Sequence, residues 1–201
     1  MKYVSIDIET TGLDPETCDI LEVAAVIDND PSVPATKLPT FRYRFVQELY
    51  RGRPIALVMH WDLFMDLASH AKNAKNVDLI GPPQNFYGPP SKFALSLNRW
   101  LYDHRIDPLA FVVAGKNFAN FDARFLSKLP RISAYVKWHH RILDPGNMFV
   151  LPGDLVVPDT NECCLRAGIN LDTQGLRHTA IYDAQQVVSL VRAGFERTKT
   201  K

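Results

Sequence analysis

The stretch "VSIDIETTGL", Val4 to Leu13, decides the fold prediction, because an apolar strand pattern ends there in two carboxylates and a turn. The segment 3–8 is rich in β-branched residues, and Gly12 is typical of a tight turn. Asp7 and Glu9 are two residues apart, so in a strand their side chains share one face, roughly 7 Å apart along the chain. Both carboxylates can then reach one divalent cation, although such a pair is also common at a solvated strand end.

Two further strands are predicted after this turn. The segment 19–30 is a largely apolar run, and Phe41 to Phe45 alternates aromatic residues with arginines, which indicates a half-buried strand. In that alternation Arg42 and Arg44 share a face, which solvent exposure explains better than contact with nucleic acid. Three successive strands joined by a turn and a loop predict an antiparallel start to the sheet.

The rest of the chain predicts an alternation of helices and strands, and therefore an α/β domain with a mixed sheet flanked by helices. The residues 79–93 are rich in proline and glycine and predict a surface loop, and the tail 196–201 is expected to fray. A single domain over 1–201 is the simplest organisation. Helices are expected over 57–73, 92–105, 120–129, 158–169 and 180–193, and buried strands over 109–115 and 139–144.

Composition restricts the function classes. The chain has 201 residues, is 46% hydrophobic and carries a formal charge of +1, which allows one good core and excludes a polycation that coats nucleic acid. Its 3 cysteines form no CxxC pair, and the start "MKYVSIDIE" places charges where a signal peptide needs an apolar run. No segment approaches the roughly 20 apolar residues of a membrane span. We therefore expect a soluble cytoplasmic protein with no membrane partner.

Two more carboxylates lie next to predicted helices and strands. Asp122 follows the predicted buried strand 109–115 and opens a helix, and Asp183 lies in the first turns of the last predicted helix. Five residues of helix rotate by about 500°, so His178 and Asp183 would not share a face of one helix, and His178 is expected in the preceding loop. Taken singly, each acid is better explained by the helix dipole or by a place beside an apolar stripe than by catalysis.

Taken together, three motifs resemble the DEDDh 3′→5′ exonucleases. This family has a ribonuclease H-like fold and includes the proofreading subunit of bacterial DNA polymerase III and oligoribonuclease. "DIETTGL" (7–13) matches the first family motif and "HTAIYDA" (178–184) matches the third. "NFANFD" (117–122) resembles the second, but Lys116 stands where the family has histidine, and one extra residue separates the asparagine from the phenylalanine.

The resemblance implies a two-metal phosphodiesterase that uses two Mg²⁺ ions, which Mn²⁺ can replace. Asp7, Glu9 and Asp183 would hold the cation that carries the attacking water, Asp7 and Asp122 would serve the second cation, and His178 would be the general base. The substrate would be the 3′ end of single-stranded DNA or RNA. The products would be nucleoside 5′-monophosphates, released one at a time. The expected substrate-binding residues are Thr10, Thr11, Leu13, Asn117 and Phe118.

Two other interpretations stay open at this point. The chain could be a catalytically inactive nucleic-acid-binding module on the same fold, or a structural domain in which the acids are caps and surface charges. The first is weakened because all four carboxylates and the histidine are present. The choice between DNA and RNA and the oligomeric state, a dimer in some relatives, are not decided by the sequence.

Overall fold

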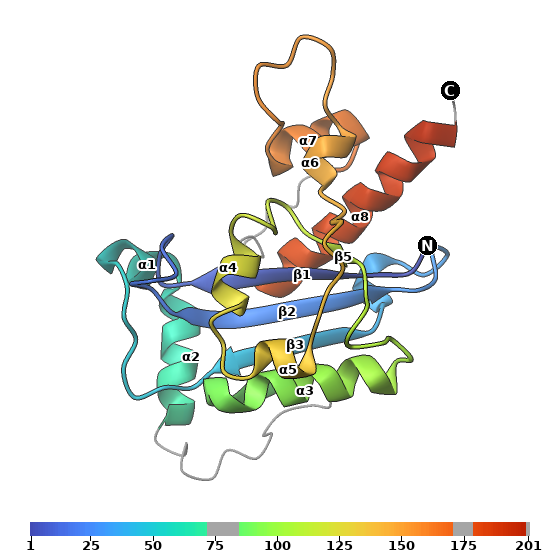
Figure 1. Cartoon of the computed structure of the whole chain (residues 1–201). Coiled ribbons are helices and arrows are strands. Elements are labelled where there is room, and N and C mark those ends of the chain that lie inside the picture. Colours follow the sequence, from blue (N-terminus) through green and yellow to red (C-terminus); the bar gives the residue numbers. More distant parts are fainter. Residues whose placement is uncertain (72–84, 171–178, 200–201) are drawn as a thin grey trace.

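The computed structural model describes residues 1–71, 85–170 and 179–199, and its centre is a five-stranded mixed sheet with helices on both faces (Figure 1). The strand order is β4-β3-β2-β1-β5. The β1–β2 and β2–β3 pairs are antiparallel, while β3–β4 and β1–β5 are parallel. This is the predicted α/β class, with an antiparallel start and parallel additions at both edges. The strands are β1 (Tyr3–Thr10), β2 (Ile20–Asp28), β3 (Thr40–Phe45), β4 (Asn85–Gly88) and β5 (Val113–Ala114).

The helices are short except for three. The longest, α8, packs along β1 and β2 on one face of the sheet, and α3 covers the other face (Figure 1). None of the helices in the described ranges is long and apolar enough to cross a membrane. The helices are α1 (Pro54–Met59), α2 (Trp61–Ala71), α3 (Pro90–Asp103), α4 (Asp122–Leu126), α5 (Ile132–Tyr135), α6 (Pro145–Met148), α7 (Thr160–Ala167) and α8 (Ala180–Lys199), with one 3-10 turn, η1 (Ala35–Lys37).

Strand alternation divides β1 between two cores. Val4, Ile6 and Ile8 point into the large core that contains the aromatic side chains of β3 and α3. Tyr3 packs on the other face against the apolar stripe of α8. Because alternate residues share a face, the remaining odd-numbered positions of β1, including Glu9, lie on the α8 side.

The register of β1 on β2 places specific pairs opposite one another on this α8 side. Tyr3 lies opposite Asp28 at one end of the two strands, and Glu9 lies opposite Glu22 at the other. The next strand continues the same row, because Arg44 lies opposite Glu22. Charged residues therefore occupy both ends of this sheet face, and Ser5 and Val26 lie opposite one another between them.

Two sequence predictions about strands are wrong. The residues 85–88, expected in a loop, form the edge strand β4, in which Phe86 packs against Phe41 at a ring distance of 5.0 Å. Proline is tolerated beside an edge strand, so the flanking prolines did not prevent pairing. The segment 139–144, expected to be a strand, is bent at residues 140–141, where the N–H of Arg141 donates to the His139 side chain at 3.0 Å, and it pairs with β5 through an isolated parallel bridge between Leu143 and Ala114.

Two helix predictions also need correction. The single helix expected over 57–73 is two helices, α1 and α2, which meet at His60. The tail expected to fray is helical as far as Lys199. The guanidinium of Arg197 lies 4.9 Å from the ring centre of Phe149, and this contact holds the last turns of α8 against the protein.

Candidate metal centre

The last residues of β1 deliver two carboxylates to the α8 side of the sheet. Asp7 and Glu9 lie two positions apart in the strand, and only 9% of the Glu9 surface is exposed. Their backbones are held in the ladder by the antiparallel partners Ala24 and Glu22 of β2. Both carboxylates are therefore fixed on a central strand of the sheet.

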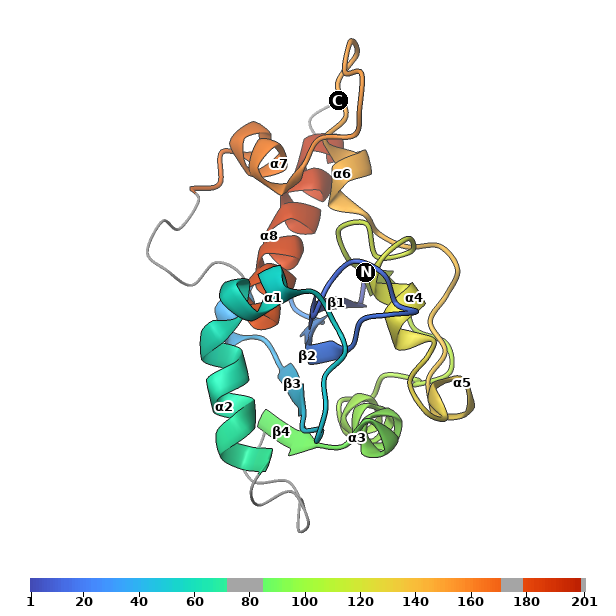
Figure 2. The same cartoon turned by 90° about the vertical axis from the view of Figure 1, so that its left-hand side faces the viewer.

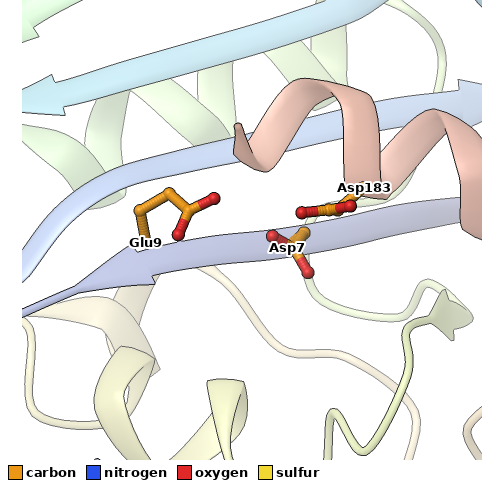
Figure 3. A group of neighbouring side chains, drawn as sticks. All are labelled: Asp7, Glu9 and Asp183. Atoms are coloured by element: carbon orange, nitrogen blue, oxygen red, sulfur yellow. The ribbon is translucent and has the colours of Figure 1, made fainter. Parts of the chain in front are cut away.

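The helix α8 delivers a third carboxylate. Its apolar stripe, which includes Ala184 and Val188, is buried against the sheet, and the Ser5 hydroxyl donates to the carbonyl of Ala184 at 2.8 Å. This hydrogen bond fixes the beginning of the helix over the middle of β1. Asp183 is in the first turn of α8 and consequently lies over Asp7 (Figure 3).

Asp7, Glu9 and Asp183 form a cluster that could hold a metal ion. One carboxylate oxygen from each lies within 4.8 Å of the other two. Figure 3 shows the three side chains between β1 and the first turn of α8. A set made entirely of carboxylate oxygens suits hard divalent cations such as Mg²⁺ and Mn²⁺ better than soft ones.

Asp122 approaches the same cluster from the edge of the sheet. It is the first residue of α4, 4% exposed, and its carboxylate accepts a hydrogen bond from the backbone N–H of Ile8. Burial raises the pKa of Asp122 to about 7, although the hydrogen bonds from Ile8 and from its own backbone act in the opposite direction. Asp122 is thus held beside β1 by the Ile8 amide and lies close enough to Asp7 and Glu9 to raise their pKa, but it is not one of the three acids whose oxygens lie within 4.8 Å of one another.

The cluster is electrostatically unfavourable without a cation. Burial, followed by repulsion from Asp122, Asp183 and Glu9, raises the pKa of Asp7 well above its ordinary value. The pKa of Glu9 is raised to about 8, first by burial and then by its acidic neighbours, and Arg42 offsets this in part. Raised pKa values of this origin are typical of carboxylates that a bound cation would stabilise in the charged form.

A histidine that the sequence analysis did not single out lies beside Glu9. His60, at the junction of α1 and α2, has its Nε2 atom 3.6 Å from Oε2 of Glu9. The junction lines one cavity with Glu9, Glu22 and Thr179, on the side of the molecule that Figure 2 presents to the viewer. In the sequence, His60 follows the spacing of an apolar helix face. The break between α1 and α2 places it beside Glu9, and no residue pattern in the sequence predicts that break.

A fifth carboxylate, Glu22, also lies at the cluster, and it changes the interpretation of the two β3 arginines. Arg42 and Arg44, predicted to face solvent, donate from Nε to Glu22 Oε2 at 2.7 and 2.8 Å. Arg44 also donates to Asp66 of α2 at 2.7 Å. The prediction of a solvated arginine face is therefore wrong, because a buried acid opposite Glu9 draws both guanidinium groups inward.

The three predicted substrate contacts in the "TTGL" turn differ in accessibility. The Thr10 hydroxyl donates to the carbonyl of Gly12 at 2.7 Å. The Thr11 hydroxyl bonds to the carbonyls of Asp19 and Arg51, and the side chain is 2% exposed. These threonines hold the turn in shape, and Leu13, 81% exposed, is the side chain that the turn presents to solvent.

The other predicted residues fall in different environments. Asn117 is exposed, has a φ of 56° and donates its N–H to Asp144 at 2.9 Å. Phe118 is fully buried, with its ring edge-on to Trp138, so the predicted base-stacking role does not fit its position. His178, the predicted general base, lies outside the described residues.

A second cavity is lined by two acids of the cluster and, among the described residues, by none of the α1–α2 junction. Asp7 and Asp183 line it together with Lys116 and the first turn of α7. Lys116 is the residue that departs from the family motif, and its ammonium lies 4.0 Å from Asp144 Oδ1. Acids of the cluster therefore line two cavities, and each cavity also contains cationic side chains.

No model of a protein family matches this sequence, and no curated protein matches it. Solved structures are similar in fold. An Exonuclease I from Methylocaldum szegediense gives a TM-score of 0.60 at 14% identity, over 98% of this chain and 41% of that one. Escherichia coli Exonuclease I in complex with a dT13 oligonucleotide gives 0.58 at 14% identity, over 99% of this chain and 42% of that one.

A zinc-bound E. coli Exonuclease I in complex with single-stranded DNA gives a TM-score of 0.56 at 13% identity, over 99% of this chain and 43% of that one. The chain thus spans about two fifths of the length of these proteins. At this identity the similarity shows a shared fold, an α/β mixed sheet consistent with the ribonuclease H-like architecture.

Proposed function

We propose that this chain is a metal-dependent 3′→5′ exonuclease that hydrolyses phosphodiester bonds at the 3′ end of single-stranded DNA or RNA. The observation that carries the proposal is the convergence of Asp7, Glu9 and Asp183 within 4.8 Å of one another, from a strand and a helix at opposite ends of the chain. The raised pKa values of Asp7 and Glu9 support it, because acids that repel one another at a fixed site need a cation.

The chemistry follows from this donor set. Two divalent cations about 3.5–4 Å apart supply a hydroxide-like nucleophile and stabilise the leaving oxygen of a phosphodiester. Asp7, Glu9 and Asp183 would hold one cation, and Asp7 with Asp122 would serve the other. His178 would accept the proton of the attacking water, because an unperturbed imidazole titrates close to neutral pH.

The exposed part of the turn after β1 is consistent with recognition of the end of a nucleic-acid strand. Leu13 is exposed in the turn that follows Glu9 and could pack on the terminal bases, while Thr10 and Thr11 keep the turn rigid. Two of the structurally similar exonucleases were crystallised with single-stranded DNA, which favours a single strand as the ligand of this chain as well. The released product would be a nucleoside 5′-monophosphate.

The test is hydrolysis of a 5′-labelled single strand, DNA and RNA in parallel, with Mg²⁺, with EDTA, and with the Asp7→Asn protein. We expect a ladder that shortens from the 3′ end with Mg²⁺, no reaction in EDTA, and a rate at least about 100-fold lower for Asp7→Asn. Asp103→Asn, an exposed acid at the end of α3, is the matched control and should cleave at the wild-type rate. Undiminished cleavage by Asp7→Asn would refute the assignment.

A further inference from the structure

Glu22 is the most deeply buried of the acids around the candidate metal centre. Its side chain is 1% exposed, in a strand whose every residue is buried. It lies directly opposite Glu9 in the β1–β2 register and lines the same cavity as Glu9. A carboxylate in such a position is costly unless its charge is balanced and both of its oxygens have partners.

One oxygen of Glu22 is fully engaged. Oε2 accepts hydrogen bonds from Arg42 Nε at 2.7 Å and from Arg44 Nε at 2.8 Å. Arg44 is fixed in turn by its 2.7 Å ion pair with Asp66. These bonds balance the charge of Glu22 and fix the orientation of its carboxylate plane.

The other oxygen is not engaged by the protein that the structure describes. Oε1 of Glu22 is buried and makes no hydrogen bond with any of the described residues. Buried oxygens of this kind normally have a donor. The side chain opposite it in β1 is Glu9, which in the ionised form that holds a cation is an acceptor and not a donor. With a cation bound, a ligand of the site could therefore supply the missing donor.

We propose that Glu22 is a positioning residue of the metal centre, whose Oε1 accepts a hydrogen bond from a water molecule bound to the cation that Glu9 holds. The inference rests on the proposed metal-dependent function. Mg²⁺ and Mn²⁺ keep several water ligands in protein sites, and these waters need acceptors around the metal. Side chains that orient ligands in this way typically change metal affinity by 10–100-fold when they are altered.

The substitution Glu22→Gln tests this contact with little change of shape. Arg42 and Arg44 are donors, so the amide oxygen of glutamine must face them. The amide NH₂ then occupies the place of Oε1 and presents two donors where the proposal requires an acceptor. Glu22→Asp is the complementary variant, because it keeps the charge and withdraws the free oxygen by one methylene.

Mn²⁺ affinity, measured by isothermal titration calorimetry on the whole chain without nucleic acid, is the readout. We expect Kd to rise 10–100-fold for Glu22→Gln and several-fold for Glu22→Asp. Asp66→Asn is the matched control, since it removes an acidic partner of Arg44 and leaves Glu22 Oε1 in place, and its Kd should stay within about twofold of wild type.

Two results would overturn the proposal in distinguishable ways. If the wild-type protein binds Mn²⁺ and Glu22→Asp binds it equally well, Glu22 makes no contact with the metal's water. If Glu22→Gln does not fold, the Glu22→Asp titration decides the question in the same way. If the wild-type protein binds no Mn²⁺ at all, the metal centre itself is refuted, and the role of Glu22 with it.

Discussion

The two ends of the β1–β2 pair carry acids on the same face of the sheet, but the acids at one end are paired with an arginine and those at the other end face further acids. At one end Arg192 of α8 donates to both oxygens of Asp28, at 2.7 and 2.9 Å. At the other end Asp7 and Glu9 meet Asp183 within 4.8 Å. The same helix therefore brings an arginine to one end of the strands and an acid to the other.

The pKa values of the acids at the two ends are shifted in opposite directions. Burial raises the pKa of Asp28, but hydrogen bonds from Arg192 and Tyr3 outweigh it, and the net shift is downward. At the opposite end burial and repulsion act together and raise the pKa of Asp7 and Glu9. Asp28 contributes to the stability of the protein, whereas the acid cluster reduces it until a cation arrives.

The largest expected effect is a difference between two identical substitutions. Asp28→Asn leaves the half-buried Arg192 without its counter-charge and should cost about 3 kcal/mol, or roughly 6–12 °C in Tm. Asp122→Asn removes one of the mutually repelling acids and, measured in EDTA, should leave Tm unchanged or raise it. Thermal unfolding by circular dichroism checks both, and equal losses for the two proteins would contradict the comparison.

A bound cation should offset the repulsion among Asp7, Glu9 and Asp183 and raise the stability of the folded protein. At a Mn²⁺ concentration about 100 times its Kd, binding to the folded state should add about 2.7 kcal/mol, or roughly 5–11 °C in Tm. The measurement is a melting curve in EDTA and in Mn²⁺. Asp183→Asn should lose most of this shift, while Asp28→Asn, although less stable, should keep it. A Tm that does not respond to Mn²⁺ would mean that the acids are not a metal centre.

The smallest expected effect concerns pH. The folded-state pKa values of Asp122 and Glu9, about 7 and about 8, exceed the usual carboxyl value near 4, so their protonated forms stabilise the protein at low pH. That contribution is complete below about pH 4 and is lost as the pH rises through 7 and 8. Asp28 has the opposite sign, because its lowered pKa gives stability that is lost as the pH falls through its folded-state pKa.

Melting curves in EDTA at pH 5 and pH 8 measure this contribution. We expect a lower Tm at pH 8, a smaller pH difference in Asp122→Asn, and a smaller difference with Mn²⁺, which binds the ionised carboxylates. The same pH difference in wild type and Asp122→Asn would show that the cluster does not titrate in this range.

The fold was predictable where a single local rule decided the structure. The alternation in β3 and the apolar runs of β1 and β2 place buried residues correctly, and a helix forms within the range 158–169, where one was expected. The predictions were wrong where tertiary contacts decided. The β4 strand depends on pairing with β3, and the end of α8 depends on the contact of Arg197 with Phe149.

The site was predictable from motifs and not from local chemistry. Each acid alone is as well explained by a cap or a surface charge, and it is the order of the motifs that singles out Asp7, Glu9, Asp122 and Asp183. Glu22 and His60 were missed for different reasons. Glu22 did carry a signal, as one acid inside the apolar run "ILEVAAVI", where a charge is costly. His60 carried none, because a helix break positions it.

The dependence of the acid cluster on α8 has a consequence for the newly made polypeptide. Asp7 and Glu9 leave the ribosome well before Asp183, which lies far along the same chain. The third ligand reaches the other two when α8 docks onto β1 through contacts such as the Ser5–Ala184 hydrogen bond. A nascent chain therefore lacks a complete cation site until α8 has been synthesised and has docked onto β1, and any nuclease activity of this protein would be delayed until then.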